Sequence, residues 1–109
     1  MTQNSNVLNQ LYSVIQNRKG DNPETSYTAE LLSQGMPKIA QKVGEEAVEV
    51  ITAALVENEN KVIKESADLL YHLLVLWAQK GVTPENVWNE LRCREGTSGV
   101  LEKTSRQKD

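Results

Sequence analysis

Apolar residues recur every three to four positions along most of this chain, which is the spacing of one face of an α-helix. In the first such stretch one face is formed by Val7, Leu8, Leu11, Val14 and Ile15. The segment "RKGDNPE" (18–24) then ends the helix, because its Gly and Pro break helical structure. No stretch shows the strict apolar and polar alternation of a β-strand. The pattern therefore predicts an all-α protein.

Residues that start and stop helices divide the rest of the chain. Ser26 can cap a short helix over residues 27–34, which stops at the glycine that follows. Pro37 suits the first turn of a long helix that reaches about residue 57. After the polar run "ENEN", a second long helix is expected over residues 61–80.

The C-terminal part holds one more helix and a tail. The segment "TPEN" (83–86) supplies a Thr cap and an early Pro for a helix to about residue 94. The polar tail over residues 94–109 is expected to be a loop or a short terminal helix. We therefore expect a single domain over residues 1–109, a bundle of four to five helices that is completed by homodimerisation.

The first long helix carries a carboxylate into its apolar face. At about 100° per residue, an apolar stripe runs through Ile39, Val43, Ala47, Val50 and Ala54. Glu46 falls inside this stripe, and Glu45 and Glu49 lie along its edge. The opposite side carries Val48, Ile51 and Leu55. The helix is therefore expected to pack on two sides, which a homodimer allows.

The second long helix repeats this feature, since Glu65, Asp68 and His72 share one narrow arc among Leu, Val and Trp. Burying an isolated carboxylate costs several kcal/mol unless a cation compensates. Mg²⁺ prefers oxygen ligands together with water and phosphate. The two helices offer four such ligands, Glu46, Glu49, Glu65 and Asp68. His72 is assigned a supporting role, in which it orients Asp68 or Glu65.

The same carboxylates also allow a simpler interpretation as ordinary salt bridges. Glu45 follows Lys42 by three positions and Glu65 follows Lys61 by four, and both spacings permit ion pairs on one helix. For "EEAVE" (45–49) taken alone, salt bridges are the favoured interpretation. The second acidic cluster, at the matching place on the next helix, favours an ion site instead.

Composition narrows the classes of protein that fit. A net charge of −3 argues against a nucleic-acid-binding protein. The apolar run over residues 69–78 is shorter than the about 20 residues that cross a bilayer, and no signal peptide is recognisable. The single Cys93 has no partner for an internal disulfide, so a cytoplasmic location is expected.

Four segments resemble one protein family. They are "SYTAELLSQG" (26–35), "KVGEEAVEV" (42–50), "ESADLLYHLLVLW" (65–77) and "REGTSGVLEKTSR" (94–106). The acidic pattern E-E-x-x-E followed by E-x-x-D is similar to that of the all-α, MazG-like nucleoside triphosphate pyrophosphatases. The remaining segments narrow the resemblance to the phosphoribosyl-ATP pyrophosphatases of histidine biosynthesis.

This resemblance implies a fold, a reaction and a set of roles. The family is a helical homodimer that holds Mg²⁺ and splits the α–β phosphoanhydride of phosphoribosyl-ATP into phosphoribosyl-AMP and pyrophosphate. The metal ligands implied here are Glu46, Glu49, Glu65 and Asp68. Glu45 would be a further ligand or would orient the attacking water, so the implied catalytic residues are Glu45, Glu46 and Glu49.

A polyphosphate substrate also needs groups that bind its anionic oxygens. The candidates are Lys42, Arg94, Ser98, Lys103 and Arg106. The glycines of "GTSG" (96–99) would let backbone N–H groups approach a phosphate. Ordinary surface charge is an equally good interpretation for Arg106.

Two other functions fit the same residues. A house-cleaning pyrophosphatase of the same superfamily would use the same metal chemistry on dUTP, dCTP or aberrant nucleotides. A non-catalytic helical dimer would use its acids only in salt bridges. A Mg²⁺ titration separates these classes, because the non-catalytic dimer neither coordinates the ion nor releases pyrophosphate.

Overall fold

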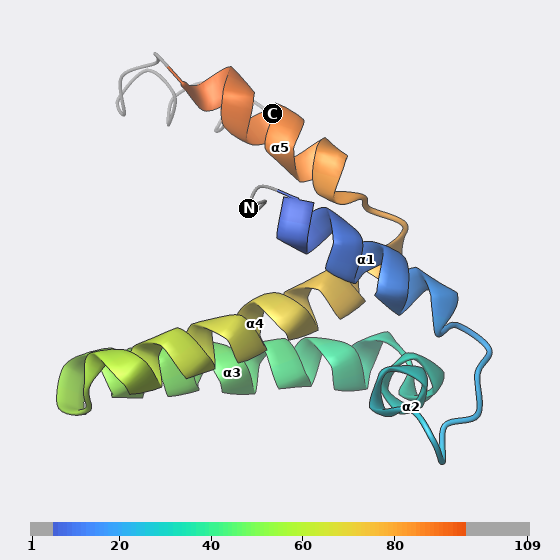
Figure 1. The fold of residues 1–109 in the computed structure, drawn as a ribbon, viewed down its shortest axis with the longest axis horizontal. Coiled ribbons are helices and arrows are strands. Elements are labelled where there is room, and N and C mark those ends of the chain that lie inside the picture. Colours follow the sequence, from blue (N-terminus) through green and yellow to red (C-terminus); the bar gives the residue numbers. More distant parts are fainter. Residues whose placement is uncertain (1–5, 96–109) are drawn as a thin grey trace.

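The computed structural model describes residues 6–95, and within them it contains helices and no strand. The helices are α1 (Val7–Asn17), α2 (Tyr27–Gln34), α3 (Met36–Val56), α4 (Glu59–Lys80) and α5 (Pro84–Arg94). Figure 1 shows that α3 and α4 form a long antiparallel hairpin, and these two helices share the most extensive contact. The other three helices gather at the end of the hairpin where α3 begins and α4 ends. The prediction of an all-α fold is confirmed.

Side-chain caps explain why the helix starts could be predicted. The Ser26 hydroxyl accepts a hydrogen bond of 3.1 Å from the backbone N–H of Ala29, which starts α2. Thr83 accepts a matching bond at the start of α5. Helix α4 begins at Glu59 rather than at residue 61, because Asn58 caps it from within the "ENEN" run. That predicted turn is therefore shorter than expected.

Two glycines allow the chain to leave one helix sharply. Gly35 joins α2 to α3 with φ of +89°, and Gly81 ends α4 with φ of +83°. Residues that carry a Cβ rarely adopt such positive φ values, so glycine suits both corners. The corner at Gly35 sends α2 steeply across the beginning of α3 (Figure 1). The two helices therefore face each other close to the first turns of α3.

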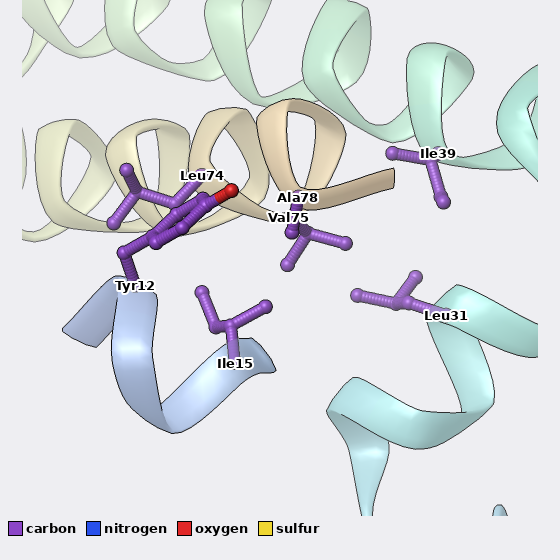
Figure 2. Close-up of a cluster of buried hydrophobic side chains, with 7 residues drawn as sticks. All are labelled: Tyr12, Ile15, Leu31, Ile39, Leu74, Val75 and Ala78. Carbon is purple, nitrogen blue, oxygen red and sulfur yellow. The ribbon is translucent and has the colours of Figure 1, made fainter. Parts of the chain in front are cut away.

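The core lies where α1, α2, α3 and α4 meet. Figure 2 shows its buried side chains, which are Tyr12, Ile15, Leu31, Ile39, Leu74, Val75 and Ala78. Complete burial of a side chain such as Ile15 or Leu74 contributes about 1.5–3 kcal/mol. The Tyr12 hydroxyl also donates a hydrogen bond of 2.8 Å to the carbonyl of Val82. Helices α1 and α2 thus pack on this end of the hairpin.

Burial along α3 differs in one position from the predicted stripe. Ala47 is less exposed, as predicted, and one series of less exposed residues runs through Ile39, Val43, Glu46, Val50 and Ala53. Successive members of this series are alternately four and three residues apart. This mean spacing of about 3.5 residues keeps the same face of a helix against its partner. The placement of Ala54 in the stripe was wrong, because Ala54 is exposed and Ala53 is fully buried. Glu46 does lie within the stripe.

The half of the hairpin that leads to its turn carries exposed apolar side chains. We call this surface the hairpin patch, and it consists of Val48, Ile51, Leu55, Val56 and Ile63, with exposed fractions from 57% to 77%. In Figure 1 this end projects away from α1, α2 and α5. The second apolar side predicted for α3 is therefore present and stays uncovered by the helices that the structure describes. None of these helices is both long and apolar enough to cross a membrane.

Candidate functional site

Three carboxylates from α3 and α4 converge midway along the hairpin. One oxygen from each of Glu46, Glu65 and Asp68 lies within 4.8 Å of the other two. We call these residues the acid triad. Glu46 and Glu65 are half-buried and Asp68 is exposed. Mg²⁺ is bound by oxygen ligands, and all three donors are carboxylate oxygens. The chemistry of this donor set therefore fits the ion.

Two lysines contact the acid triad from its edges. Lys61 Nζ lies 3.2 Å from a carboxylate oxygen of Glu65, and this hydrogen bond raises the pKa of Lys61. Lys42 Nζ lies 3.8 Å from a carboxylate oxygen of Glu46. Among residues 6–95, the carboxylate of Asp68 has no ion pair or hydrogen bond. The salt bridges that the sequence permitted are thus present, but they compensate only part of the triad's charge.

Glu45 and Glu49 lie next to the acid triad without joining it. Glu45 is exposed and accepts a hydrogen bond of 2.9 Å from Gln41, and this bond, together with Lys42 at 3.5 Å, lowers the pKa of Glu45. Glu49 is also exposed, and its charge helps to raise the pKa of Lys61. Of the four predicted metal ligands, the structure therefore brings three together. The roles of Glu45 and Glu49 stay predictions.

Lys42 is the cation that lies deepest at this site. Burial alone would lower the pKa of Lys42, but its interactions with Tyr27, Glu45 and Glu46 outweigh this effect and raise that pKa. Burial in turn raises the pKa of Tyr27, although Lys42 opposes this effect. Lys42 is therefore a cation at neutral pH, beside the acid triad, as its predicted contact with phosphate requires.

His72 is buried and links α2 to α4 beside the acid triad. Its Nδ1 lies 2.8 Å from the main-chain carbonyl of Asp68, and a carbonyl can only accept. Nδ1 therefore carries a proton, and in the neutral imidazole Nε2 accepts a hydrogen bond of 3.0 Å from the Tyr27 hydroxyl. His72 thus supports the main chain of Asp68, while no hydrogen bond or ion pair with the carboxylates of Asp68 or Glu65 is found in the described part of the chain.

Three residues of this link had no predicted role. The hydroxyls of Thr28 and Tyr71 form a hydrogen bond, and the rings of Tyr27 and Tyr71 stack with centroids 6.2 Å apart. Their segments "SYT" (26–28) and "YH" (71–72) lie within two of the stretches that carry the resemblance to the family, so the sequence did single them out. Spacing alone could not pair them, since 43 positions separate Thr28 from Tyr71.

The predicted phosphate contacts at the C-terminus are only partly described. Arg94 ends α5 and forms an ion pair of 3.3 Å with Glu90. Ser98, Lys103 and Arg106 lie outside residues 6–95. Their roles in binding the substrate stay predictions.

Comparison with known proteins matches these features to one family. The profile of the phosphoribosyl-ATP pyrophosphohydrolase family matches residues 8–95. A phosphoribosyl-ATP pyrophosphatase of Paramagnetospirillum magneticum is 58% identical over 99% of this chain and 99% of its own. Proteins of the same name from Rhodospirillum rubrum and Azospirillum brasilense are 57% and 56% identical, over 94% and 93% of this chain and 87% and 91% of their own. The chain belongs to the phosphoribosyl-ATP pyrophosphohydrolase family.

Proposed function

We propose that this chain hydrolyses the α–β phosphoanhydride of phosphoribosyl-ATP, a step of histidine biosynthesis, with Mg²⁺ as its cofactor. The observation that carries the proposal is the acid triad, found in a chain that is 58% identical to a phosphoribosyl-ATP pyrophosphatase. Three carboxylates repel a polyphosphate unless a cation lies between them. Lys42 and Lys61 compensate part of this charge, and a Mg²⁺ ion held by the acid triad would compensate the rest.

Each side chain of the site has its own proposed role in the reaction. Glu46, Glu65 and Asp68 would hold Mg²⁺, which neutralises charge on the phosphate oxygens when the anhydride bond breaks. Glu49 is the proposed fourth ligand, since its exposed side chain can rotate toward Glu46 one turn away. Lys42 adds a second positive charge beside the phosphates.

Glu45 is the proposed acceptor for the proton of the attacking water. Glu45 is exposed beside Glu46, so a water held at the acid triad is within its reach. The hydrogen bond from Gln41 and the contact with Lys42 lower the pKa of Glu45, so it can accept the proton only once these contacts loosen. The water oxygen forms a bond to phosphorus, and the bond from that phosphorus to the bridging oxygen breaks. The products are phosphoribosyl-AMP and pyrophosphate, and Glu45 releases the proton to solvent.

The test is pyrophosphate release from phosphoribosyl-ATP, measured with Mg²⁺ and with a chelator, beside a panel of ATP, dUTP and dCTP. We expect Mg²⁺-dependent turnover of phosphoribosyl-ATP and loss of turnover in Glu46→Gln. Glu24→Gln is the matched control, because Glu24 is exposed in the loop before α2. Preferred turnover of dUTP or dCTP would identify a house-cleaning enzyme. No turnover of any nucleotide would identify a non-catalytic dimer.

A second copy of this chain is the proposed partner of the hairpin patch. Contiguous apolar surface on a soluble protein marks an interface, whereas single exposed apolar residues do not. Val48, Ile51 and Leu55 follow one another at helical spacing on α3, so they form such a continuous stripe. A two-fold axis through this stripe would bury the same surface on both copies.

The cytoplasm is the proposed location of the protein. Cys93 is exposed and free at the end of α5. An exposed thiol persists most readily in a reducing compartment, where disulfides are rare.

A further inference from the structure

A pocket lies between α2 and the first half of α3, beside the acid triad. Its volume is about 210 Å³, and its polar lining consists of Tyr27, Glu30, Gln34, Lys38, Lys42 and Glu45. Pockets that enclose a whole drug-sized ligand measure about 300–1,000 Å³. This pocket therefore suits one arm of a nucleotide substrate rather than the whole molecule.

Lys42 connects this pocket to the acid triad. It lines the pocket, and its ammonium group lies 3.8 Å from the carboxylate of Glu46. Lys38 lies one helical turn further from the triad. The eight residues from Lys38 to Glu46 rise by about 12 Å along α3. A ligand anchored at the triad by its phosphates therefore reaches Lys38 only if a sizeable group separates its two ends.

The polar side chains that line the pocket indicate which chemical group of the ligand binds there. Lys38 has no salt bridge within the part of the chain that the structure describes, so its charge is available to an anion. Glu30 and Gln34 line the same pocket and offer acceptors for hydroxyl groups. A bare pyrophosphate has no hydroxyl donors for Glu30 and Gln34, and it is too short to span from the triad to Lys38. A sugar phosphate carries both hydroxyl donors and an anionic end.

We infer that this pocket binds the ribose 5-phosphate arm of phosphoribosyl-ATP, the group that an ordinary nucleotide lacks. Lys38 binds the phosphate of this arm, and Glu30 and Gln34 accept hydrogen bonds from its hydroxyls. The inference rests on the proposed function, since the metal at the acid triad anchors the triphosphate. It makes Lys38 a specificity-determining residue, although Lys38 is distant from the bond that breaks.

The test compares the wild type with Lys38→Met, Lys38→Arg and Lys80→Met. Lys80 is an exposed lysine in the last turn of α4 that does not line the pocket, so it controls for the loss of one surface charge. With phosphoribosyl-ATP as substrate, we expect Lys38→Met to raise KM roughly ten- to hundredfold with kcat unchanged, as the loss of one charge-assisted hydrogen bond predicts. Lys38→Arg keeps the charge and should stay close to the wild type, as should Lys80→Met.

Product inhibition isolates the arm itself, because phosphoribosyl-AMP and AMP differ only by the ribose 5-phosphate. The wild type should bind phosphoribosyl-AMP more tightly than AMP, and Lys38→Met should bind the two nucleotides with similar affinity. If Lys38→Met keeps the preference, the pocket assignment is overturned while the proposed function stands. If Lys38→Met weakens inhibition by pyrophosphate instead, the terminal phosphates lie at Lys38 and the assignment is again overturned. Absence of phosphoribosyl-ATP turnover in the wild type would overturn the proposed function itself.

Discussion

The Tyr27 hydroxyl donates a hydrogen bond to Nε2 of the buried His72 and so fastens α2 onto α4. Tyr27→Phe removes this donor and leaves a buried ring nitrogen without a partner. We expect the free energy of unfolding to fall by about 1–3 kcal/mol. Urea unfolding at an unchanged m-value would measure this loss.

The same substitution in a His72→Leu background is the control for this contact. Once the ring nitrogen is absent, replacing Tyr27 by Phe should change the stability far less than it does in the wild type. Equal losses in both backgrounds would show that Tyr27 contributes by packing and that its bond to His72 adds nothing.

Loss of one carboxylate should abolish hydrolysis without harming the fold. We expect Asp68→Asn and Glu49→Gln to lose Mg²⁺-dependent pyrophosphate release. Their metal-free Tm should hold or rise, because fewer like charges then repel one another around the acid triad. Calorimetric Mg²⁺ titration would measure metal binding by each variant, and thermal melting would measure its metal-free Tm. A lower Tm in Asp68→Asn would mean that this acid is structural.

The helices could be predicted because their signals are local. Ser26, Asn58 and Thr83 each cap a helix through a backbone group only three residues away. The burial of Ala54 was predicted wrongly because it is not a local property. Which residues of α3 are buried depends on how α3 packs against α4. A straight helix examined alone gives a spacing of about 3.6, whereas its partner imposes about 3.5.

The site could be predicted only as far as spacing along one helix determines it. Glu65 and Asp68 are three residues apart, so the sequence itself places them together. The pocket at Lys38 could not be predicted, because it depends on how the corner at Gly35 directs α2 across α3. The bond from Tyr27 to His72 spans 45 positions and depends on the same crossing.

A charged side chain introduced into the hairpin patch should dissociate the proposed dimer into monomers. Ile51 is 57% exposed in the single chain, so Ile51→Glu should leave the folded protomer intact while placing a carboxylate in an apolar interface. Light scattering should show a dimer for the wild type and a monomer for Ile51→Glu. Val14→Glu, at a comparably exposed position on α1, should stay dimeric. A monomeric wild type at micromolar concentration would refute the dimer.

Truncation after Arg92 should impair turnover of phosphoribosyl-ATP far more than it impairs Mg²⁺ binding. The acid triad lies on α3 and α4, and no residue after Arg92 belongs to it. The removed segment contains Arg94, Ser98, Lys103 and Arg106, which suit phosphate and are poor Mg²⁺ ligands. The exposed pair of Arg94 with Glu90 contributes at most about 1 kcal/mol to stability.

Each charge-assisted hydrogen bond to phosphate contributes about 1.5–3 kcal/mol, so losing two of them should lower kcat/KM at least a hundredfold. Truncation after Glu95 is the matched control, because it keeps all of α5 and Arg94 while removing Ser98, Lys103 and Arg106. If only the shorter protein loses activity, Arg94 or the end of α5 carries the effect. Unchanged turnover in both truncated proteins would show that residues 93–109 do not select the substrate, and recognition of the ribose 5-phosphate arm would then fall to the pocket at Lys38.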